Sequence, residues 1–218
     1  MMSECTHECS TCGESCSQRQ EPQPLLKELN PAARVGKVYG VVSGKGGTGK
    51  TSFTAGVGAA LALSGLRVLC VDCDIGLRNL DIALGLSDAA LMDFSDVAQQ
   101  RCTLERAVVA HPQLAKLSLL TAPIRQRGQP VTGEQMASLL RAVRMQYDFC
   151  LLDAPAGLGD GFLLATAAAD RCVVVTTADA SSLRDAQHTV MELGRFGPGK
   201  LHLVVNRVRK KLLRSMHA

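Results

Sequence analysis

The chain has few aromatic residues and no tryptophan. Of its 218 residues, 3% are Phe, Trp or Tyr. Proteins that bind single-stranded nucleic acid stack bases on aromatic side chains, so this composition argues against that class. No apolar run reaches the roughly 18 residues of a membrane-spanning helix, and residues 1–24 contain no Leu, Ile, Val or Phe. We therefore expect neither a transmembrane segment nor a signal-peptide core, and we expect a cytoplasmic protein.

The net charge of +4 is unevenly distributed. Residues 195–218 carry seven basic and no acidic residues, whereas residues 1–30 carry five acidic and two basic ones. A basic terminus can bind anionic lipid or nucleic acid, but a solvated surface is the simpler interpretation. The sequence does not favour DNA as a partner.

The cysteines do not form the pattern of a disulfide-rich secreted domain. Their number, nine, is odd. Cys70, Cys150 and Cys172 stand in apolar runs, where a free cysteine packs as a small hydrophobic residue. Cys70 and Cys73 form a C-x-x-C pair, but on a strand their side chains would point to opposite faces. We interpret this pair as structural.

Four cysteines crowd the N-terminus, at Cys5, Cys9, Cys12 and Cys16. Four thiolates suit tetrahedral Zn²⁺ or a [4Fe–4S] cluster. A redox-sensitive tail that binds nothing is the alternative, and both interpretations stay open.

The apolar runs from residue 37 onward are nearly continuous rather than alternating, which is typical of parallel strands covered by helices on both faces. The predicted strands are Val38–Ser43, Arg67–Asp72, Leu117–Thr121, Phe149–Asp153, Cys172–Thr176 and Leu201–Asn206. Helices are predicted at Lys50–Ser64, ended by Gly65, at Glu134–Met145, and after a capping box from Ser182 to Asp185. The pattern predicts a doubly wound α/β fold with a mostly parallel sheet flanked by helices.

The segment from Gly44 to Thr51 matches the phosphate-loop pattern G-x-x-x-x-G-K-[ST] between a predicted strand and helix. Glycines let successive backbone N–H groups turn toward phosphate oxygens, and the helix N-terminus adds a partial positive charge. Lys50 would contact the β- and γ-phosphates and Thr51 would bind Mg²⁺. The nucleotide-binding residues predicted in this segment are Gly44, Lys45, Gly46, Gly47, Thr48, Gly49, Lys50, Thr51 and Ser52.

A second lysine, Lys45, lies inside this loop. It would add a charge beside the same phosphates, or it would be an ordinary exposed lysine. Loop geometry alone does not decide between these alternatives.

Three aspartates follow predicted strands at the edge where ligands bind in such folds. Asp72 and Asp74 follow the second strand, and Asp153 ends the fourth. Any single one could be a turn or helix-cap residue. Together with the phosphate loop, they predict a site for a nucleotide and Mg²⁺, with Gly157 and Gly159 as a hinge beside it.

These motifs resemble the deviant Walker A P-loop ATPases, the MinD/ParA family, and within it the MinD group. Lys45 is similar to the family's extra lysine, and the segment from Asp72 to Asp81 resembles the MinD switch I sequence. Residues 153–157 resemble switch II, and residues 181–185 resemble a further MinD segment. The resemblance covers about residues 37–213.

The resemblance implies a role for each matched residue. Lys45 would reach across an ATP-bound homodimer, and Lys50 and Thr51 would serve the phosphates and Mg²⁺ of their own subunit. Asp74 would position the attacking water, and Asp153 would support Mg²⁺ through water. Lys45, Lys50 and Asp74 are thus the expected catalytic residues, and Thr51, Asp74 and Asp153 the expected Mg²⁺ residues.

By the same resemblance, Asn206 would read the adenine edge. The family implies ATP hydrolysis, a homodimer, a division inhibitor as partner, an anionic membrane surface at the inner face of the cell membrane, and a role in septum-site placement. Family members continue past the position where this chain stops, at Ala218, so we expect a C-terminally truncated domain. A nucleotide-bound adaptor that does not hydrolyse ATP is a further alternative.

The N-terminal cysteines resemble those of Mrp-type iron–sulfur carrier ATPases, which share the loop, so a cluster carrier is the alternative function. Their switch I differs from residues 74–81, and this chain lacks their second, later C-x-x-C pair. We therefore divide the chain into a Cys-rich extension (residues 1–24), a connector (residues 25–36) and a P-loop ATPase domain (residues 37–218).

Overall fold

The computed structural model describes residues 36–126 and 128–208, which form a single seven-stranded sheet with the strand order β3-β4-β2-β5-β1-β6-β7. Its strands are β1 (Lys37–Val42), β2 (Val68–Asp72), β3 (Val109–Ala110), β4 (Leu117–Leu120), β5 (Phe149–Asp153), β6 (Arg171–Thr177) and β7 (Leu201–Asn206). Within this part of the chain, all neighbouring strands are parallel except β3, which is antiparallel to β4. The predicted doubly wound, mostly parallel fold is confirmed.

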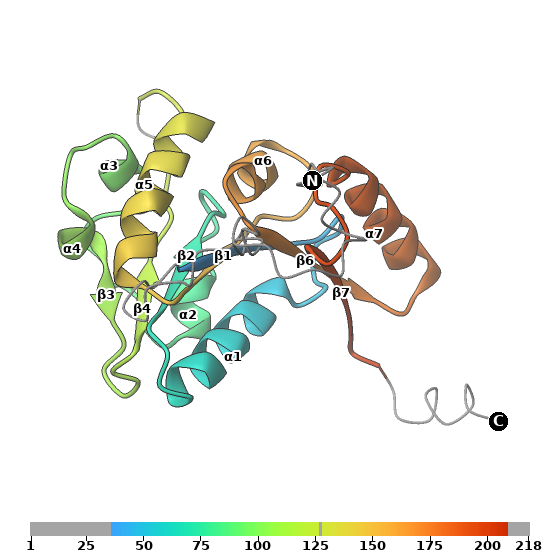
Figure 1. Cartoon of the computed structure of the whole chain (residues 1–218), viewed down its shortest axis with the longest axis horizontal. Helices are drawn as coiled ribbons and strands as arrows, with labels where there is room; N and C mark the ends of the chain where they lie inside the picture. Colours follow the sequence, from blue (N-terminus) through green and yellow to red (C-terminus); the bar gives the residue numbers. More distant parts are fainter. Residues whose placement is uncertain (1–35, 127, 209–218) are drawn as a thin grey trace, which may run out of the picture. The chain divides into compact units, whose positions relative to one another are not determined.

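Two layers of helices cover the sheet (Figure 1). On one face, α1 (Lys50–Leu63) and α2 (Leu80–Ala83) bury Ala55, Ala62 and Leu80 against the strands. The helices that build the core of the other face are α3 (Phe94–Ala98), α4 (Leu104–Ala107), α5 (Gly133–Gln146), α6 (Asp160–Ala167) and α7 (Ala180–Glu192). Burial on both faces explains the continuous apolar runs of the central strands.

The cysteines of the C-x-x-C pair lie in different layers, as expected for a structural pair. Cys70 belongs to the core under α1, and Cys73 belongs to the core of the opposite face. Cys150 and Cys172 are also buried. Burial raises the pKa of Cys70 to about 12 and raises the pKa of Cys150 well above its ordinary value, because a thiolate would be desolvated there.

The ends of two helices test the capping predictions. Gly65 adopts φ +88° after α1, and Leu66 N–H donates to the Leu61 carbonyl at 3.2 Å, so the predicted glycine C-cap is confirmed. The predicted capping box from Ser182 is wrong. The N-cap of α7 is Asp179, whose side chain accepts a hydrogen bond from Ser182 N–H at 3.0 Å. Ser182 is itself buried inside the helix.

The strand β7 departs from the expectation of burial on both faces. It lies at the end of the sheet, and the side chains of Leu203 and Val205 are 57% and 40% exposed. The pattern of apolar residues alone does not distinguish an edge strand from a central one. Among the helices of the described residues, none is both long and apolar enough to cross a bilayer.

Candidate functional site: the phosphate loop and its carboxylates

The phosphate loop connects β1 to α1, as predicted, and its conformation requires glycine. Gly47 and Gly49 adopt φ +75° and +93°, in the left-handed region that residues with a Cβ rarely adopt. A Cβ on Gly49 would lie 2.4 Å from the Asn206 side-chain nitrogen, whereas a Cβ on Gly47 would meet nothing within 4 Å. The loop is therefore packed at Gly49 and open at Gly47.

Lys50 is the first residue of α1 and is buried, with 8% exposure. Its Nζ donates to Ser43 Oγ at 2.7 Å, and Ser43 Oγ in turn donates to the Lys45 carbonyl at 2.6 Å. Desolvation lowers the pKa of Lys50, and the carboxylates of Asp153 and Asp74 oppose that shift. An ammonium group is thus held inside the loop, close to the carboxylates at the strand ends.

Two of the predicted carboxylates are neighbours in the sheet. Asp72 and Asp153 are paired in the register of β2 and β5 and are 1% and 2% exposed. Burial raises the pKa of Asp72 to about 6 and that of Asp153 to about 7. Asp153 accepts a hydrogen bond from Thr54 Oγ1 at 3.3 Å and another from the Thr51 side chain. These aspartates are therefore part of a buried polar cluster.

Asp74 begins the loop after β2 and is only partly buried. Desolvation raises its pKa, and the charge of Lys50 opposes the shift. Its backbone N–H donates to Asp72 Oδ1 at 2.8 Å, and Leu80 N–H donates to Asp72 Oδ2 at 3.1 Å. The sequence grouped Asp72 with the metal-binding acids and missed this contact: its carboxylate holds both ends of the segment that contains Asp74.

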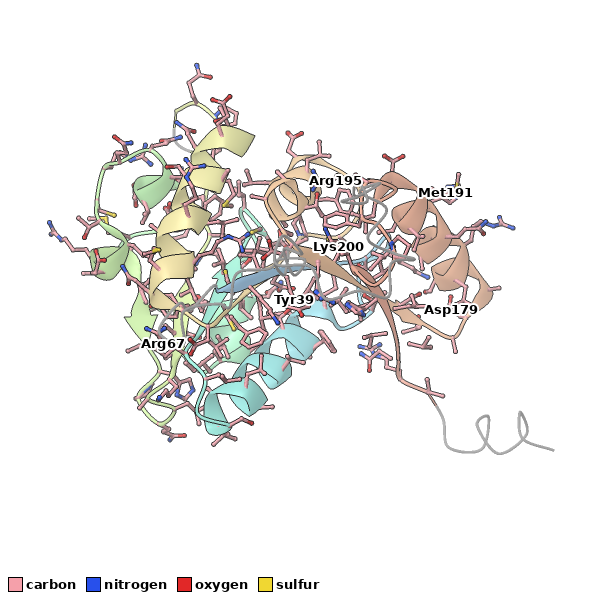
Figure 2. The ribbon with its side chains drawn as sticks, in the orientation of Figure 1. Tyr39, Arg67, Asp179, Met191, Arg195 and Lys200 are labelled. Atoms are coloured by element: carbon pink, nitrogen blue, oxygen red, sulfur yellow. The ribbon has the colours of Figure 1, made fainter. Side chains whose placement is uncertain are left out.

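Lys45 points to the other side of the loop, toward the start of α7, where Figure 2 labels Asp179. Its Nζ donates to Ser181 Oγ at 2.9 Å and lies 3.9 Å from Asp179 Oδ1. The side chains of Lys45 and Asp179 are 47% and 53% exposed. Hydrogen bonds, first from Thr177 and then from Ser182, lower the pKa of Asp179. Lys45 is thus accessible, but it is held by two polar side chains.

Asn206, at the end of β7, contacts the loop directly. Its Nδ2 donates to the Thr48 carbonyl at 2.9 Å, and its Oδ1 accepts from Arg207 N–H at 2.8 Å. Thr48 Oγ1 is buried and has no hydrogen-bond partner within the described residues. The expected contact of Asn206 with adenine stays a prediction.

The oxygen atoms at this site suit a Mg²⁺ ion that is bound jointly by the protein and a nucleotide. They do not suit a Mg²⁺ ion that is surrounded by protein ligands alone. Within residues 36–126 and 128–208, no three His, Cys, Asp or Glu side chains are arranged to hold a metal ion. Mg²⁺ commonly uses one or two protein oxygens, water and substrate phosphates, and the Thr51 hydroxyl and the Asp153 carboxylate offer such oxygens. The four N-terminal cysteines lie outside the described residues.

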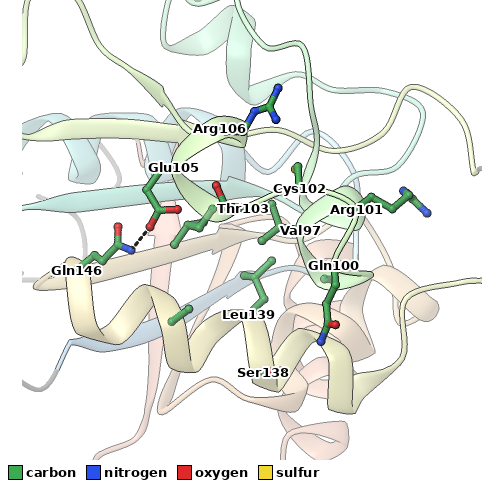
Figure 3. Close-up of a pocket in the computed structure, with 13 residues that line it drawn as sticks. Val97, Gln100, Arg101, Cys102, Thr103, Glu105, Arg106, Ser138, Leu139 and Gln146 are labelled. Carbon is green, nitrogen blue, oxygen red and sulfur yellow. Dashed lines mark hydrogen bonds between the residues drawn. The ribbon is translucent and has the colours of Figure 1, made fainter.

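A second hollow lies away from this site, between α3–α4 and α5 (Figure 3). Its volume is about 580 Å³, and Val97 and Leu139 are among the apolar side chains that line it. Glu105 accepts a hydrogen bond from Gln146 at 2.6 Å at its rim. It contains none of the predicted site residues, so it is separate from the phosphate loop.

Known proteins resemble this chain in sequence and in fold. The family model described as "ParA: NUBPL iron-transfer P-loop NTPase" matches residues 34–206. The septum site-determining protein MinD of Synechocystis is 40% identical over 177 residues, which cover 81% of this chain and 66% of that relative. The chain thus spans slightly less than two thirds of that protein's length.

Solved structures give the same result. The MinC:MinD cell division protein complex of Aquifex aeolicus matches with a TM-score of 0.74 and 35% identity, covering 83% of this chain and 72% of that one. The MinD protein of Pyrococcus horikoshii complexed with Mg-ADP matches with a TM-score of 0.65 and 30% identity, covering 77% and 67%. The chain therefore belongs to the ParA/MinD family of P-loop NTPases.

Proposed function

We propose that the chain is a MinD-like ATPase, a switch that dimerises with ATP, hydrolyses it to ADP and phosphate, and acts in septum-site placement at the membrane. The observation that carries this proposal is the pair of lysines in one loop: Lys50 buried toward the carboxylates, and Lys45 half-exposed on the opposite side. The identity of 40% with a MinD protein supports it.

In this proposal, Lys50 and the loop amides bind the phosphates of the chain's own nucleotide. The ammonium of Lys50 is already desolvated, and charges interact more strongly in such surroundings than in water. Its present partner is the neutral hydroxyl of Ser43, which a phosphate oxygen can replace. Lys50 therefore needs little reorganisation to bind a triphosphate.

Asp74 orients the attacking water. Its side chain is partly exposed, whereas Asp72 and Asp153 are almost completely buried. Desolvation raises the pKa of Asp74, and the charge of Lys50 opposes that shift; the ionised carboxylate is the form that accepts a hydrogen bond from water. Thr51 and Asp153 would hold Mg²⁺, which would neutralise charge on the phosphates. The Thr48 hydroxyl, which has no hydrogen-bond partner among residues 36–126 and 128–208, is a further group available to the nucleotide.

Lys45 acts between subunits. In the monomer it is bonded to Ser181 beside Asp179, and these contacts are exposed and therefore weak. When ATP binds, Lys45 leaves this position and contacts the phosphates of the partner subunit in the homodimer. A division inhibitor is the proposed partner of the dimer, supported by the solved MinC:MinD complex of a relative. The proposed location is the cytoplasm and the inner face of the cell membrane.

A phosphate-release assay tests this function. The chain is incubated with Mg-ATP, with and without vesicles of anionic lipid, and vesicles of neutral lipid are the control. We expect steady release of phosphate, and more protein bound to anionic vesicles with ATP than with ADP. No release above buffer would overturn the ATPase proposal and favour the adaptor that only binds nucleotide.

A second function, iron–sulfur cluster transfer, has two observations in its favour: the matched family model is described as iron-transfer, and four cysteines lie within residues 5–16. The MinD relatives favour the first function. Anaerobic reconstitution of the full chain, with iron and sulfide analysis and an absorption spectrum, tests the second. Cys9→Ser should lose bound iron, whereas Cys102→Ser should retain it. Colourless protein without stoichiometric metal would remove both the cluster and the zinc proposal.

A further inference from the structure

The segment from Asp74 to Asp81 (loop 74–81) is fixed at its two ends. The buried carboxylate of Asp72 accepts the N–H groups of Asp74 and Leu80 at 2.8 and 3.1 Å. Leu80 is fully buried in the core under α1. These contacts fix the ends of the loop, but the segment between them needs its own constraint if the Asp74 side chain is to stay in place.

Arg78 supplies that constraint through its backbone. Its N–H donates to the Asp74 carbonyl at 3.3 Å and closes a turn over the residues between them. Its φ is +46°, a left-handed conformation that is unfavourable for a residue with a Cβ. Residues kept in such conformations by their surroundings are concentrated at functional sites and switch segments.

The side chain of Arg78 connects the loop to α2. Its Nη2 donates to Asp81 Oδ2 at 3.2 Å, and the two side chains are only 15% and 8% exposed. The other oxygen of Asp81 accepts Ile82 N–H at 2.7 Å, inside α2. Because α2 packs against α1, the helix that begins at Lys50, the ion pair connects the Asp74 turn to the phosphate-binding helix.

The ion pair leaves one buried nitrogen of the Arg78 guanidinium without a hydrogen-bond acceptor among the described residues, which is unfavourable. Within the described part of the chain, the Arg78 Nε is buried without a hydrogen-bond acceptor. A buried donor without a partner is unfavourable. A pair that served only to stabilise α2 would require neither the left-handed backbone nor the desolvated nitrogen. Both features follow if the chain must keep the turn that contains Asp74 in one conformation.

We infer that Arg78 is a positioning residue for Asp74: through its ion pair with Asp81, it holds the turn that places the Asp74 carboxylate against the attacking water. This inference rests on the proposed ATPase function. It assigns Arg78 no contact with the nucleotide, so loss of its side chain should slow hydrolysis without weakening ATP binding.

The experiment compares Arg78→Ala and Arg78→Lys with wild type, with Arg106→Ala as a control because Arg106 is an exposed arginine on α4. We expect Arg78→Ala to lower kcat by about 10- to 100-fold and to change the Kd for ATP by less than about threefold. Lysine can keep one N–H donor toward Asp81, so Arg78→Lys should recover kcat to within roughly fivefold of wild type. Amide hydrogen exchange at Asp74 and Leu80 should accelerate in Arg78→Ala.

Where the wild type hydrolyses ATP, two results would overturn the inference. One is a wild-type kcat in Arg78→Ala. Another is a parallel loss of kcat, ATP affinity and Tm in both Arg78 variants, which would indicate a purely structural pair. Absence of hydrolysis by the wild type would instead overturn the proposed function. In that case the hydrogen-exchange measurement still tests whether Arg78 holds the turn. Unchanged exchange at Asp74 and Leu80 in Arg78→Ala would show that it does not.

Discussion

The two sides of the phosphate loop differ in how firmly they hold their lysine. On the inner side, Lys50 is buried, bonded to a buried serine and close to buried carboxylates. On the outer side, Lys45 is half-exposed and bonded to Ser181, which is also exposed. One loop thus combines a preorganised side with a releasable side, which the proposed function assigns to the chain's own nucleotide and to a second subunit.

Gly49→Ala should have the largest effect, because it inserts a methyl group into the packed inner side. The new Cβ would collide with the Asn206 amide at 2.4 Å while the backbone is held at φ +93°. We expect the affinity for ATP to fall by more than about 10-fold and Tm to fall as well. The measurements are isothermal titration with ATP and thermal unfolding.

Gly47→Ala is the matched control, since Gly47 also has a left-handed φ but nothing lies near its Cβ. Gly47→Ala should lower the free energy of unfolding by only about 1–2 kcal/mol, which is the cost of placing a residue with a Cβ in the left-handed conformation. Equal losses in the two variants would show that the loop is no more tightly packed at Gly49 than at Gly47.

Lys50→Ala removes the desolvated ammonium group. Hydrogen bonds to charged groups contribute about 1.5–3 kcal/mol each, so the affinity for ATP should fall roughly 10- to 150-fold. Titration with Mg-ATP measures this. Lys116→Ala removes an exposed lysine and should leave affinity unchanged; a similar loss there would indicate a general charge effect rather than a contact on the inner side.

The buried carboxylates predict how stability depends on pH. Their pKa values of about 6 for Asp72 and about 7 for Asp153 lie above the ordinary 3.8. Between these limits the folded state binds more protons than the unfolded state, so the free energy of unfolding should fall as the pH rises from about 4 to about 7. Urea unfolding of the nucleotide-free chain at pH 5 and pH 8 measures it.

Asp153→Asn should make the free energy of unfolding less dependent on pH and should stabilise the nucleotide-free chain at pH 8. Asp88→Asn is the control, because Asp88 is exposed and its left-handed φ of +59° suits asparagine. A dependence on pH that Asp153→Asn leaves unchanged would mean that Asp153 is not the titrating group.

Asp179→Asn should have the smallest effect, because asparagine can still accept the N-cap hydrogen bond from Ser182 N–H, and the charge opposite Lys45 at the exposed outer contact is what the substitution removes. Exposed ion pairs are weak, so the Kd for ATP should change by less than about threefold and Tm hardly at all. Nucleotide titration and thermal unfolding measure both. A change as large as that of Lys50→Ala would show that the outer side is as firmly organised as the inner side.

Much of this fold could be predicted because the sequence features that indicate it extend over several consecutive residues. Continuous apolar runs identify the central strands, and Gly65 marks the end of α1. The phosphate loop is recognisable because its glycines and lysine stand at fixed spacing between a strand and a helix. These features depend on neighbouring residues, so no knowledge of distant contacts is required.

The remaining features depend on contacts between residues far apart in the sequence, or belong to helices and strands too short to show a periodic pattern of apolar residues. The helices α2, α3 and α4 have four or five residues each, and β3 has two. Whether Asp179 or Ser182 caps α7 is decided by where the chain leaves β6. The contact of Asp72 with Leu80 and that of Lys45 with Ser181 join segments whose pairing appears only in the folded chain.

Sedimentation velocity of Lys45→Ala with Mg-ATP tests the contrast between the two lysines most directly. The account predicts that wild type sediments as a dimer with ATP and as a monomer with ADP. Lys45→Ala should bind ATP with nearly wild-type affinity and remain a monomer. An ATP-bound dimer of Lys45→Ala as stable as that of wild type would contradict the account, because the outer lysine would then have no role between subunits.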